Sequence, residues 1–227
     1  MASGSTIRDR FHMSPPPGAV DLAQIWSIDL TNKLLNLTWQ AYDNLHGYFL
    51  QTLPWDEDYD DLERSITREL EQAIQDVMDG FLPVRVQHGP PEHASKAPPP
   101  AQPPEYDIAF VWRADSRIMW PLEAKVIKSD RNTLTNLKDY IVTVRGRYLT
   151  CKYAPFSNSG AMIVYLKQGD PLQVLANIAM RLNVQLGHYP DFVTRPHRVS
   201  DHTRRVPPGE DYPRDFRCHH LIFVLGK

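Results

Sequence analysis

The stretch MWPLEAKVIKS, residues 119–129, carries an acid and a base two positions apart in an otherwise apolar run. Side chains two residues apart on a strand point to the same side, so Glu123 and Lys125 share one face while their apolar neighbours face the core. A charged group in such a run is costly to bury unless its charge is compensated. Glu123 and Lys125 are therefore the first candidates for chemistry.

Asp107 joins this pair if the segment YDIAFVW (106–112) forms a hairpin with it. When the polar link RADSR closes the hairpin, Trp112 faces Ile118 and Asp107 lies directly opposite Glu123. Directly paired residues have Cβ atoms about 4.5–5.5 Å apart. Two carboxylates at that distance repel each other, which raises a pKa unless a cation lies nearby.

A hard divalent cation offers that compensation. We expect Mg²⁺ or Mn²⁺ to be held by Asp107 and Glu123, with the Ala124 carbonyl as a further ligand and water completing an octahedron. Such an ion polarises a phosphate and lowers the pKa of a bound water, and Lys125 would stabilise the charge that develops in the transition state. This chemistry is phosphodiester hydrolysis. The alternative is an exposed cross-strand ion pair, which the apolar residues on both sides disfavour.

A fourth group comes from a helix predicted over residues 62–80, which ends at Gly80. Apolar residues recur with helical spacing at positions 62, 66, 70, 73, 74 and 77. On a helical wheel Glu63 falls inside the apolar stripe and Glu69 lies at its edge. We expect Glu63 to assist as a direct or water-mediated metal ligand, although a glutamate in a first turn also stabilises the helix dipole.

The remaining segments predict a mixed α/β or α+β fold. We expect a disordered leader over 1–20, a helical extension over 21–59 and one domain over 60–227. The elements expected besides those above are one long helix or a helical pair over 21–53, strands over 81–87, 159–170 and 218–226, a Pro-rich loop over 88–104, and helices over 133–149 and 171–183. The helix 21–53 is expected to pack on the core or to form a homodimer contact, which would bring two sites together.

Composition argues for a cytoplasmic protein with no membrane span, because no apolar run approaches the required length and only two cysteines are present. The net charge of −2 is unevenly distributed: residues 1–122 hold 9 Lys/Arg and 18 Asp/Glu, whereas residues 123–227 hold 16 and 9. A solvated surface with chance asymmetry explains this division equally well. Several residues of the basic half are candidates for phosphate contacts, although a solvated position is the more common fate of any single one. They are Lys138, Arg145, Arg147, Tyr148, Lys152, His202 and Arg204.

Together these residues resemble the PD-(D/E)XK nuclease superfamily, which has the restriction-endonuclease-like fold. Asp107 and Glu123-Ala124-Lys125 look like its acid and E-x-K elements, although Tyr106-Asp107 stands where the family has Pro-Asp. LERSITREL resembles an E-x-x-(I/L)-T-x-x-L helix seen before the hairpin in several restriction and defence nucleases. GRYLTCKYAPFSNSGAMIVYLKQGD and SDHTRR are similar to segments that follow E-x-K in the same group. The resemblance covers roughly residues 60–226.

This resemblance implies a core in the order α-β-β-β-α-β and a metal-dependent endonuclease acting on DNA, with RNA not excluded. It also implies a role in prokaryotic or phage restriction or defence, including a place as the nuclease subunit of a larger system with partner subunits. One alternative is a catalytically silent member of the fold that serves as a nucleic-acid-binding or scaffold subunit. A third interpretation is a non-nuclease structural protein in which the D…ExK pattern is accidental.

Overall fold

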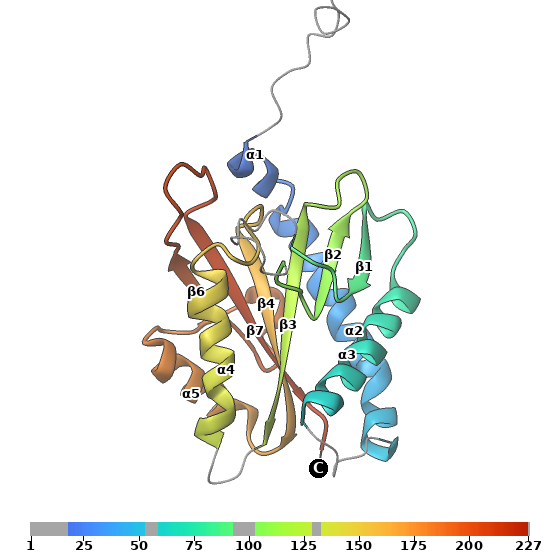
Figure 1. Cartoon of the computed structure of the whole chain (residues 1–227). Helices are drawn as coiled ribbons and strands as arrows, with labels where there is room; N and C mark the ends of the chain where they lie inside the picture. Colours follow the sequence, from blue (N-terminus) through green and yellow to red (C-terminus); the bar gives the residue numbers. More distant parts are fainter. Residues whose placement is uncertain (1–17, 53–58, 93–102, 129–132, 227) are drawn as a thin grey trace, which may run out of the picture.

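A seven-stranded mixed sheet forms the centre of the protein (Figure 1). The computed structural model describes residues 18–52, 59–92, 103–128 and 133–226. The strands are β1 (Val84–His88), β2 (Ile108–Trp112), β3 (Met119–Lys128), β4 (Ser159–Gln168), β5 (Gly187–His188), β6 (His197–Thr203) and β7 (Asp215–Val224). They lie in the order β1-β2-β3-β4-β7-β6-β5. β3, β4 and β7 run parallel, and the pairs on either side of them are antiparallel.

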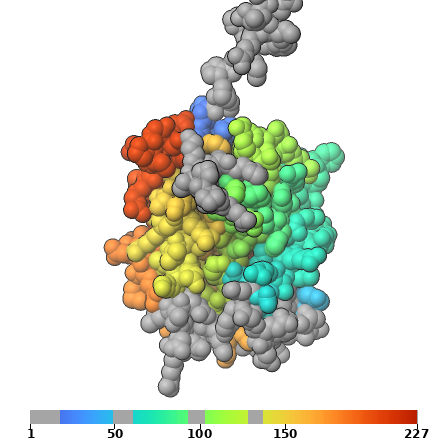
Figure 2. All heavy atoms as spheres, in the orientation of Figure 1, coloured from blue at the N-terminus to red at the C-terminus, as the bar shows by residue number. Residues whose placement is uncertain are grey.

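Helices cover both faces of this sheet (Figure 1). They are α1 (Ala19–Ala23), α2 (Ile28–Thr52), α3 (Tyr59–Val77), α4 (Thr133–Thr143) and α5 (Pro171–Leu182). α2 and α3 pack with one face of the sheet around Trp39 and Trp120, and α4 and α5 pack with the other around Tyr140 and Ile178. The surfaces of α3 (cyan) and α4 (yellow) both reach the side turned to the viewer in Figure 2. The predicted mixed α/β class is confirmed. No described helix has the length and apolar character needed to cross a membrane.

Local sequence explains where the helices lie. The predicted apolar stripe of α3 is buried against the sheet, with Leu62, Ile66 and Leu70 fully inaccessible. α5 begins where the Asp170 side chain accepts a hydrogen bond from the Leu172 N–H at 2.9 Å, with proline in the first turn. It ends at Asn183, whose left-handed backbone (φ 55°) suits a helix terminus.

The β2–β3 hairpin has the predicted register. Ile108 pairs with Leu122 and Val111 pairs with Met119, as the closure through residues 113–117 requires. β2 begins at Ile108, however, whereas β3 continues six residues beyond Leu122. The second half of β3 therefore has β4 on one side and an open edge on the other. This open edge is where the candidate site lies.

The N-terminal helices belong to the same folded unit as the sheet. The Trp39 ring of α2 lies 4.8 Å from the Phe223 ring of β7, and the Tyr42 hydroxyl donates to the Val224 carbonyl at 2.8 Å. The prediction that this region packs on the core is therefore confirmed. Several large apolar side chains of α2 are buried in the chain's own core, and the predicted homodimer contact on this region stays a prediction.

Other boundaries also differ from expectation. The leader does not extend to residue 20, because α1 starts at Ala19 and its N–H donates to Asp211; residues 1–17 lie outside the described part. The helix predicted over 133–149 ends its α-helical part at Thr143 and continues as a π-helical turn, Val144–Tyr148. The base of the Pro-rich loop is ordered by a β-bridge between Pro91 and Glu105, while residues 93–102 lie outside the description. β5 and β6 were not predicted.

Candidate active site

The carboxylates of Asp107 and Glu123 lie together at the point where β2 begins beside β3. The Asp107 Oδ2 accepts a hydrogen bond from the Ala124 N–H at 2.7 Å, and the Glu123 Oε1 accepts one from the Asp107 N–H at 3.2 Å. These bonds continue the ladder beyond the last β2–β3 pair, with side-chain oxygens in place of backbone carbonyls. They fix both carboxylates at the fork, the point beyond Ile108 and Leu122 where β2 and β3 are no longer paired. This arrangement agrees with the predicted pairing of Asp107 with Glu123.

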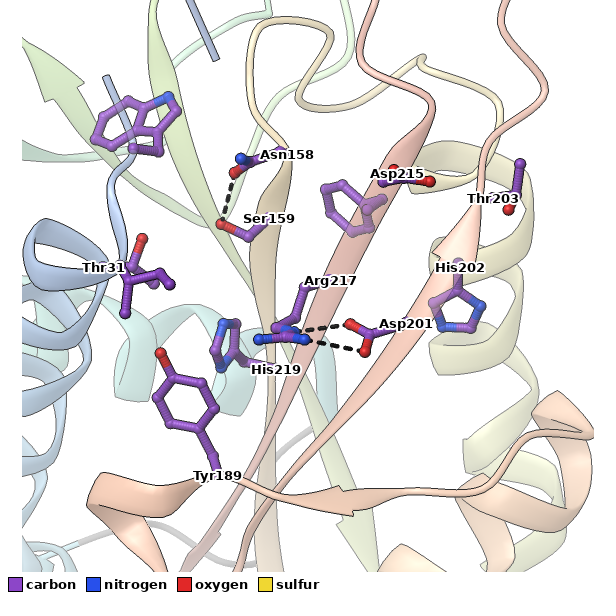
Figure 3. A pocket seen from close by; sticks show the side chains of 13 residues that line it. Thr31, Asn158, Ser159, Tyr189, Asp201, His202, Thr203, Asp215, Arg217 and His219 are labelled. Carbon is purple, nitrogen blue, oxygen red and sulfur yellow. Dashed lines mark hydrogen bonds and ion pairs between the residues drawn. The ribbon is translucent and has the colours of Figure 1, made fainter. Parts of the chain in front are cut away.

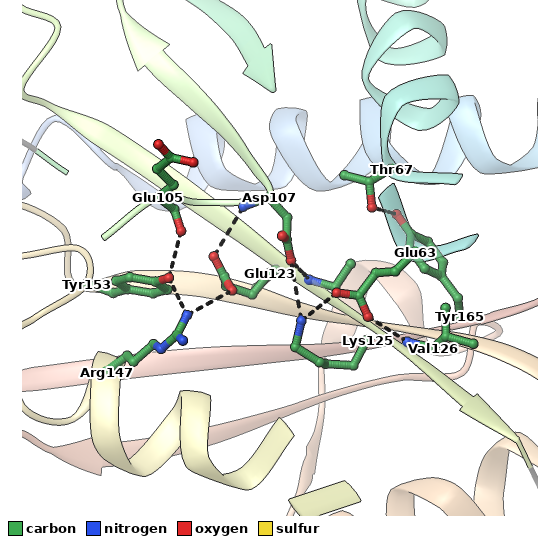
Figure 4. Close-up of polar contacts among 12 residues, drawn as sticks. Glu63, Thr67, Glu105, Asp107, Glu123, Lys125, Val126, Arg147, Tyr153 and Tyr165 are labelled. Carbon is green, nitrogen blue, oxygen red and sulfur yellow. Dashed lines mark hydrogen bonds and ion pairs between the residues drawn. The ribbon is translucent and has the colours of Figure 1, made fainter. Parts of the chain in front are cut away.

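Glu63 occupies the next position along the open edge. Its Oε2 accepts from the Val126 N–H at 3.0 Å, and its Oε1 accepts from the Lys125 ammonium at 2.6 Å. One turn further along α3, the Thr67 hydroxyl lies 3.2 Å from the Tyr165 hydroxyl of β4, so the helix is fixed to the sheet beside the site (Figure 4). Glu63 points inward, as predicted, but its two oxygens contact Lys125 and the backbone of Val126.

The ammonium of Lys125 lies between two acids. Its Nζ is 2.6 Å from Glu63 and 3.8 Å from Asp107. Burial alone would lower the pKa of Lys125, but the charges of Asp107 and Glu63 outweigh it and leave that pKa raised. Lys125 is therefore held as a cation at neutral pH.

Glu123 is the most deeply buried acid of the group, with 2% of its surface exposed. Burial, and then repulsion by Asp107, raise the pKa of Glu123 well above its usual range. Burial also raises the pKa of Glu63, and Lys125 opposes that shift. An ionised Glu123 is thus costly in this fold unless positive charge is added next to it.

Arg147 approaches Glu123 from the side away from Lys125 (Figure 4). It lies in the π-helical turn after α4, and its Nη1 is 4.0 Å from the Glu123 Oε2. The guanidinium stands over the Tyr153 ring at 5.1 Å and donates to the Tyr153 hydroxyl, which donates to the Glu105 carbonyl at 2.7 Å. Arg147 was predicted from the sequence, whereas its partners Tyr153 and Glu105 were not (Figure 4).

These groups line one cavity of about 420 Å³. Five of its lining residues are acids, against two cations, Lys125 and Arg147. Asp139 and Thr143 reach the cavity from α4, and neither was predicted as a site residue. Its complete lining is Glu63, Glu105, Asp107, Glu123, Lys125, Val126, Asp139, Val142, Thr143 and Arg147.

Asp107 and Glu123 fit the ligand preferences of Mg²⁺. Glu123 has no cation closer than Arg147 at 4.0 Å among the described residues, and Asp107 has none closer than Lys125 at 3.8 Å. The Ala124 carbonyl faces the same open edge as its N–H, because both groups of a strand residue point to one side. No three His, Cys, Asp or Glu side chains of the described part form a complete metal site. Mg²⁺ does not require one, since it is usually held by one or two carboxylates with water and substrate oxygens.

Most of the predicted phosphate contacts lie elsewhere. Lys138, Arg145 and Lys152 are exposed but do not line this cavity. Arg145 donates to the carbonyls of Arg181 and Leu182 at the end of α5, at 2.9 and 3.1 Å. His202 lies in a second cavity, where it contacts the Ser200 hydroxyl at 2.6 Å.

Two of the predicted phosphate contacts are wrong because the side chains are buried. Tyr148 is inaccessible, and its hydroxyl donates to the Ala161 carbonyl at 3.2 Å. Arg204 is 4% exposed, lies 4.0 Å above the Phe216 ring and donates to the carbonyls of Ala154 and Ser157. Arg204 therefore holds the turn that carries Tyr153, which is a structural role.

Comparisons of the chain with protein-family models, with curated proteins and with solved structures found no match.

Proposed function

We propose that the protein is a metal-dependent endonuclease that hydrolyses phosphodiester bonds in DNA. One observation supports this above all: Asp107, Glu123, Lys125 and Glu63 come from three elements and meet in one cavity at the open edge of β3. A purely structural ion pair does not need a second, buried carboxylate beside it, because each extra buried charge has a desolvation cost.

In this proposal Asp107, Glu123 and the Ala124 carbonyl hold Mg²⁺ or Mn²⁺, which when bound supplies Lewis-acid polarisation of the phosphate and an acidified water. Lys125 holds a positive charge in the same cavity. Its position suits stabilisation of the charge that develops on the phosphate oxygens. Glu63 keeps the ammonium aimed at the cavity and maintains its charge.

The charge of the cavity is consistent with a requirement for metal. Its five acids outnumber Lys125 and Arg147, so a phosphate that enters alone meets net repulsion. Added divalent charge offsets most of this excess and compensates the buried Glu123 at the same time. We therefore expect substrate and metal to bind cooperatively.

The likeness to the PD-(D/E)XK nucleases extends the proposal. The observed succession α3-β1-β2-β3-α4-β4 agrees with the order α-β-β-β-α-β that the resemblance implies. On this basis we propose a restriction-endonuclease-like core and a cytoplasmic role in prokaryotic or phage defence, with partner subunits. Cleavage of both strands of a duplex would require two copies of the chain acting together, and the proposed homodimer contact lies on the helix 21–53 region.

Cleavage of supercoiled plasmid tests the proposed activity. Purified protein is incubated with plasmid in Mg²⁺, in Mn²⁺ and in a chelator, with single-stranded DNA and RNA in parallel reactions. We expect nicking or linearisation of DNA with either metal and none in the chelator. Binding of DNA without cleavage under every metal condition would instead support the silent, nucleic-acid-binding alternative.

Glu63→Gln is expected to reduce cleavage about 10–100-fold, the range typical of residues that position a catalytic group. The amide keeps a hydrogen-bond acceptor for the Val126 N–H but loses the charge that fixes the Lys125 ammonium. Initial rates at saturating metal measure the effect. Glu69→Gln on the exposed side of α3 is the matched control and should leave the rate unchanged. Equal rates for both variants would remove Glu63 from the site.

Arg147 and Arg145 lie two residues apart, and we expect the first to act in cleavage and the second in stability. Arg147→Ala should lower the cleavage rate about 10–100-fold, because it removes a cation from the cavity wall. Arg145→Ala should leave the rate unchanged and lower the melting temperature by about 2–4 °C, because it removes the hydrogen bonds to the end of α5. Rates and thermal unfolding curves of both variants decide the matter, and a reversed pattern would contradict these roles.

A further inference from the structure

Arg147 stands off from its carboxylate partner in the candidate active site. Its Nη1 lies 4.0 Å from the Glu123 Oε2, which is beyond hydrogen-bonding distance. At the second cavity, by contrast, Arg217 contacts Asp201 directly through two hydrogen bonds of 2.7 and 3.0 Å (Figure 3). The gap at Glu123 calls for a physical cause, because a buried carboxylate gains most from a direct charge-assisted hydrogen bond.

The hydroxyl of Tyr153 accounts for this gap. The Arg147 Nη1, which is the atom paired with Glu123, donates a hydrogen bond to that hydroxyl (Figure 4). The hydroxyl donates its own proton to the Glu105 carbonyl at 2.7 Å, so its oxygen accepts from Arg147. The guanidinium also lies over the Tyr153 ring, 5.1 Å from its centroid. Tyr153 thus offers Arg147 a neutral acceptor in place of a Glu123 oxygen.

Tyr153 is fixed in place, so it cannot follow the guanidinium toward Glu123. Its buried ring contacts the rings of Tyr106 and Tyr148, with centroids 4.7 and 5.7 Å away. Its N–H donates to the Arg147 carbonyl at 3.1 Å, which joins its turn to the π-helical turn. The next residue, Ala154, has a left-handed backbone (φ 51°), and its N–H donates to the Tyr106 hydroxyl at 2.6 Å. A residue other than glycine keeps such a backbone only where the surrounding structure imposes it.

The gap matters for metal binding at Glu123. An arginine fork that closes on a carboxylate commonly engages both of its oxygens. The Glu123 Oε1 accepts from the Asp107 N–H, and the described residues give Oε2 no hydrogen bond. We propose that Tyr153 is a positioning residue that keeps Arg147 from closing on Glu123 and so leaves Glu123 able to bind the metal. This inference rests on the proposed hydrolysis, because it takes Glu123 as a metal ligand.

Mn²⁺ affinity of the full chain in the absence of DNA, measured by electron paramagnetic resonance of the free ion, tests this role. Tyr153→Phe removes only the hydroxyl and should weaken Mn²⁺ binding about tenfold, because the metal must then displace a direct hydrogen bond from Arg147 to Glu123. Tyr42→Phe is the matched control, since its hydroxyl donates to the Val224 carbonyl outside the cavity, and it should bind Mn²⁺ as the wild type does. Wild-type affinity in Tyr153→Phe would overturn the proposal.

A double variant separates positioning from packing. Arg147→Ala has no guanidinium to hold away and should bind Mn²⁺ at least as tightly as the wild type. Adding Tyr153→Phe to Arg147→Ala should then cause no further change in affinity, because the two residues act through one contact. If the double variant binds Mn²⁺ more weakly than Arg147→Ala, the hydroxyl acts through the fold and the positioning role is wrong.

The crystal structure of Tyr153→Phe in a chelator gives a readout that needs neither metal nor cleavage. The distance between the Arg147 Nη1 and the Glu123 Oε2 should fall from 4.0 Å to about 2.8 Å, and an unchanged distance would overturn the proposal. The positioning role and the hydrolysis can fail separately. Cleavage by the wild type together with wild-type Mn²⁺ affinity in Tyr153→Phe would remove only the positioning role. The expected changes in affinity without cleavage of any nucleic acid would remove only the hydrolysis.

Discussion

Lys125→Ala is expected to reduce metal-dependent DNA cleavage by about 10²–10³-fold while leaving the fold intact. The ammonium is the positive charge held between Glu63 and Asp107, and no other lysine of the described residues lines that cavity. Loss of one well-placed group that stabilises transition-state charge commonly has an effect of this size. Plasmid cleavage rates and a far-ultraviolet circular dichroism spectrum of the variant measure activity and folding separately.

Lys33→Ala is the matched control for this variant. Lys33 is an exposed residue of α2 and lines neither cavity, so the same change of residue type should leave the rate unaltered. If Lys125→Ala retains the wild-type rate, the activity comes from a contaminant or from another site. If both variants lose activity equally, the effect is not specific to the cavity.

Glu123→Gln is expected to abolish cleavage and to make the metal-free protein more stable. The carboxylate is 2% exposed and lies beside Asp107, so the folded state bears the cost of an uncompensated charge. Glutamine keeps an oxygen that can accept from the Asp107 N–H and carries no charge. We expect the melting temperature to rise by about 2–8 °C in a chelator at neutral pH.

The pH dependence of this gain has a definite sign. In the folded protein the pKa of Glu123 is raised above its ordinary value of 4.5. Below pH 4.5 this group therefore makes its full contribution to the stability of the wild-type protein. That contribution is lost as the pH rises through the folded-state pKa. The gain of Glu123→Gln should therefore shrink as the pH falls toward 4.5. Thermal unfolding of both proteins across this range tests the trend, and a variant less stable than wild type at neutral pH would contradict it.

The hairpin at the centre of the site could be predicted because strand geometry leaves few alternatives. Once residues 113–117 close the turn, the register of β2 on β3 fixes which side chains are opposite, and strand alternation places Glu123 and Lys125 together. Glu63 followed from the helical period of α3 in the same way. These are local rules, and they also identified the helices and most strands.

Contacts between distant segments could not be predicted. Tyr148 and Arg204 look like surface contacts in the sequence, but the turn after α4 places Tyr148 in the core, and Arg204 is enclosed by the carbonyls of residues 153–157. β6 has a polar sequence and becomes a strand because β7 pairs with it along its whole length. The side chain of Tyr153 reaches Arg147 through a turn whose Ala154 adopts a positive φ of 51°, which no local pattern indicates.

Anomalous diffraction from crystals soaked in Mn²⁺ tests the central claim most directly. The carboxylates of Asp107 and Glu123 should bind one ion at the fork between β2 and β3, within direct bonding distance of both side chains and of the Ala124 carbonyl. The peak should disappear in Glu123→Gln crystals treated in the same way. An anomalous map with no peak at that fork under saturating Mn²⁺, or with ions bound only elsewhere on the protein, would contradict the proposed site.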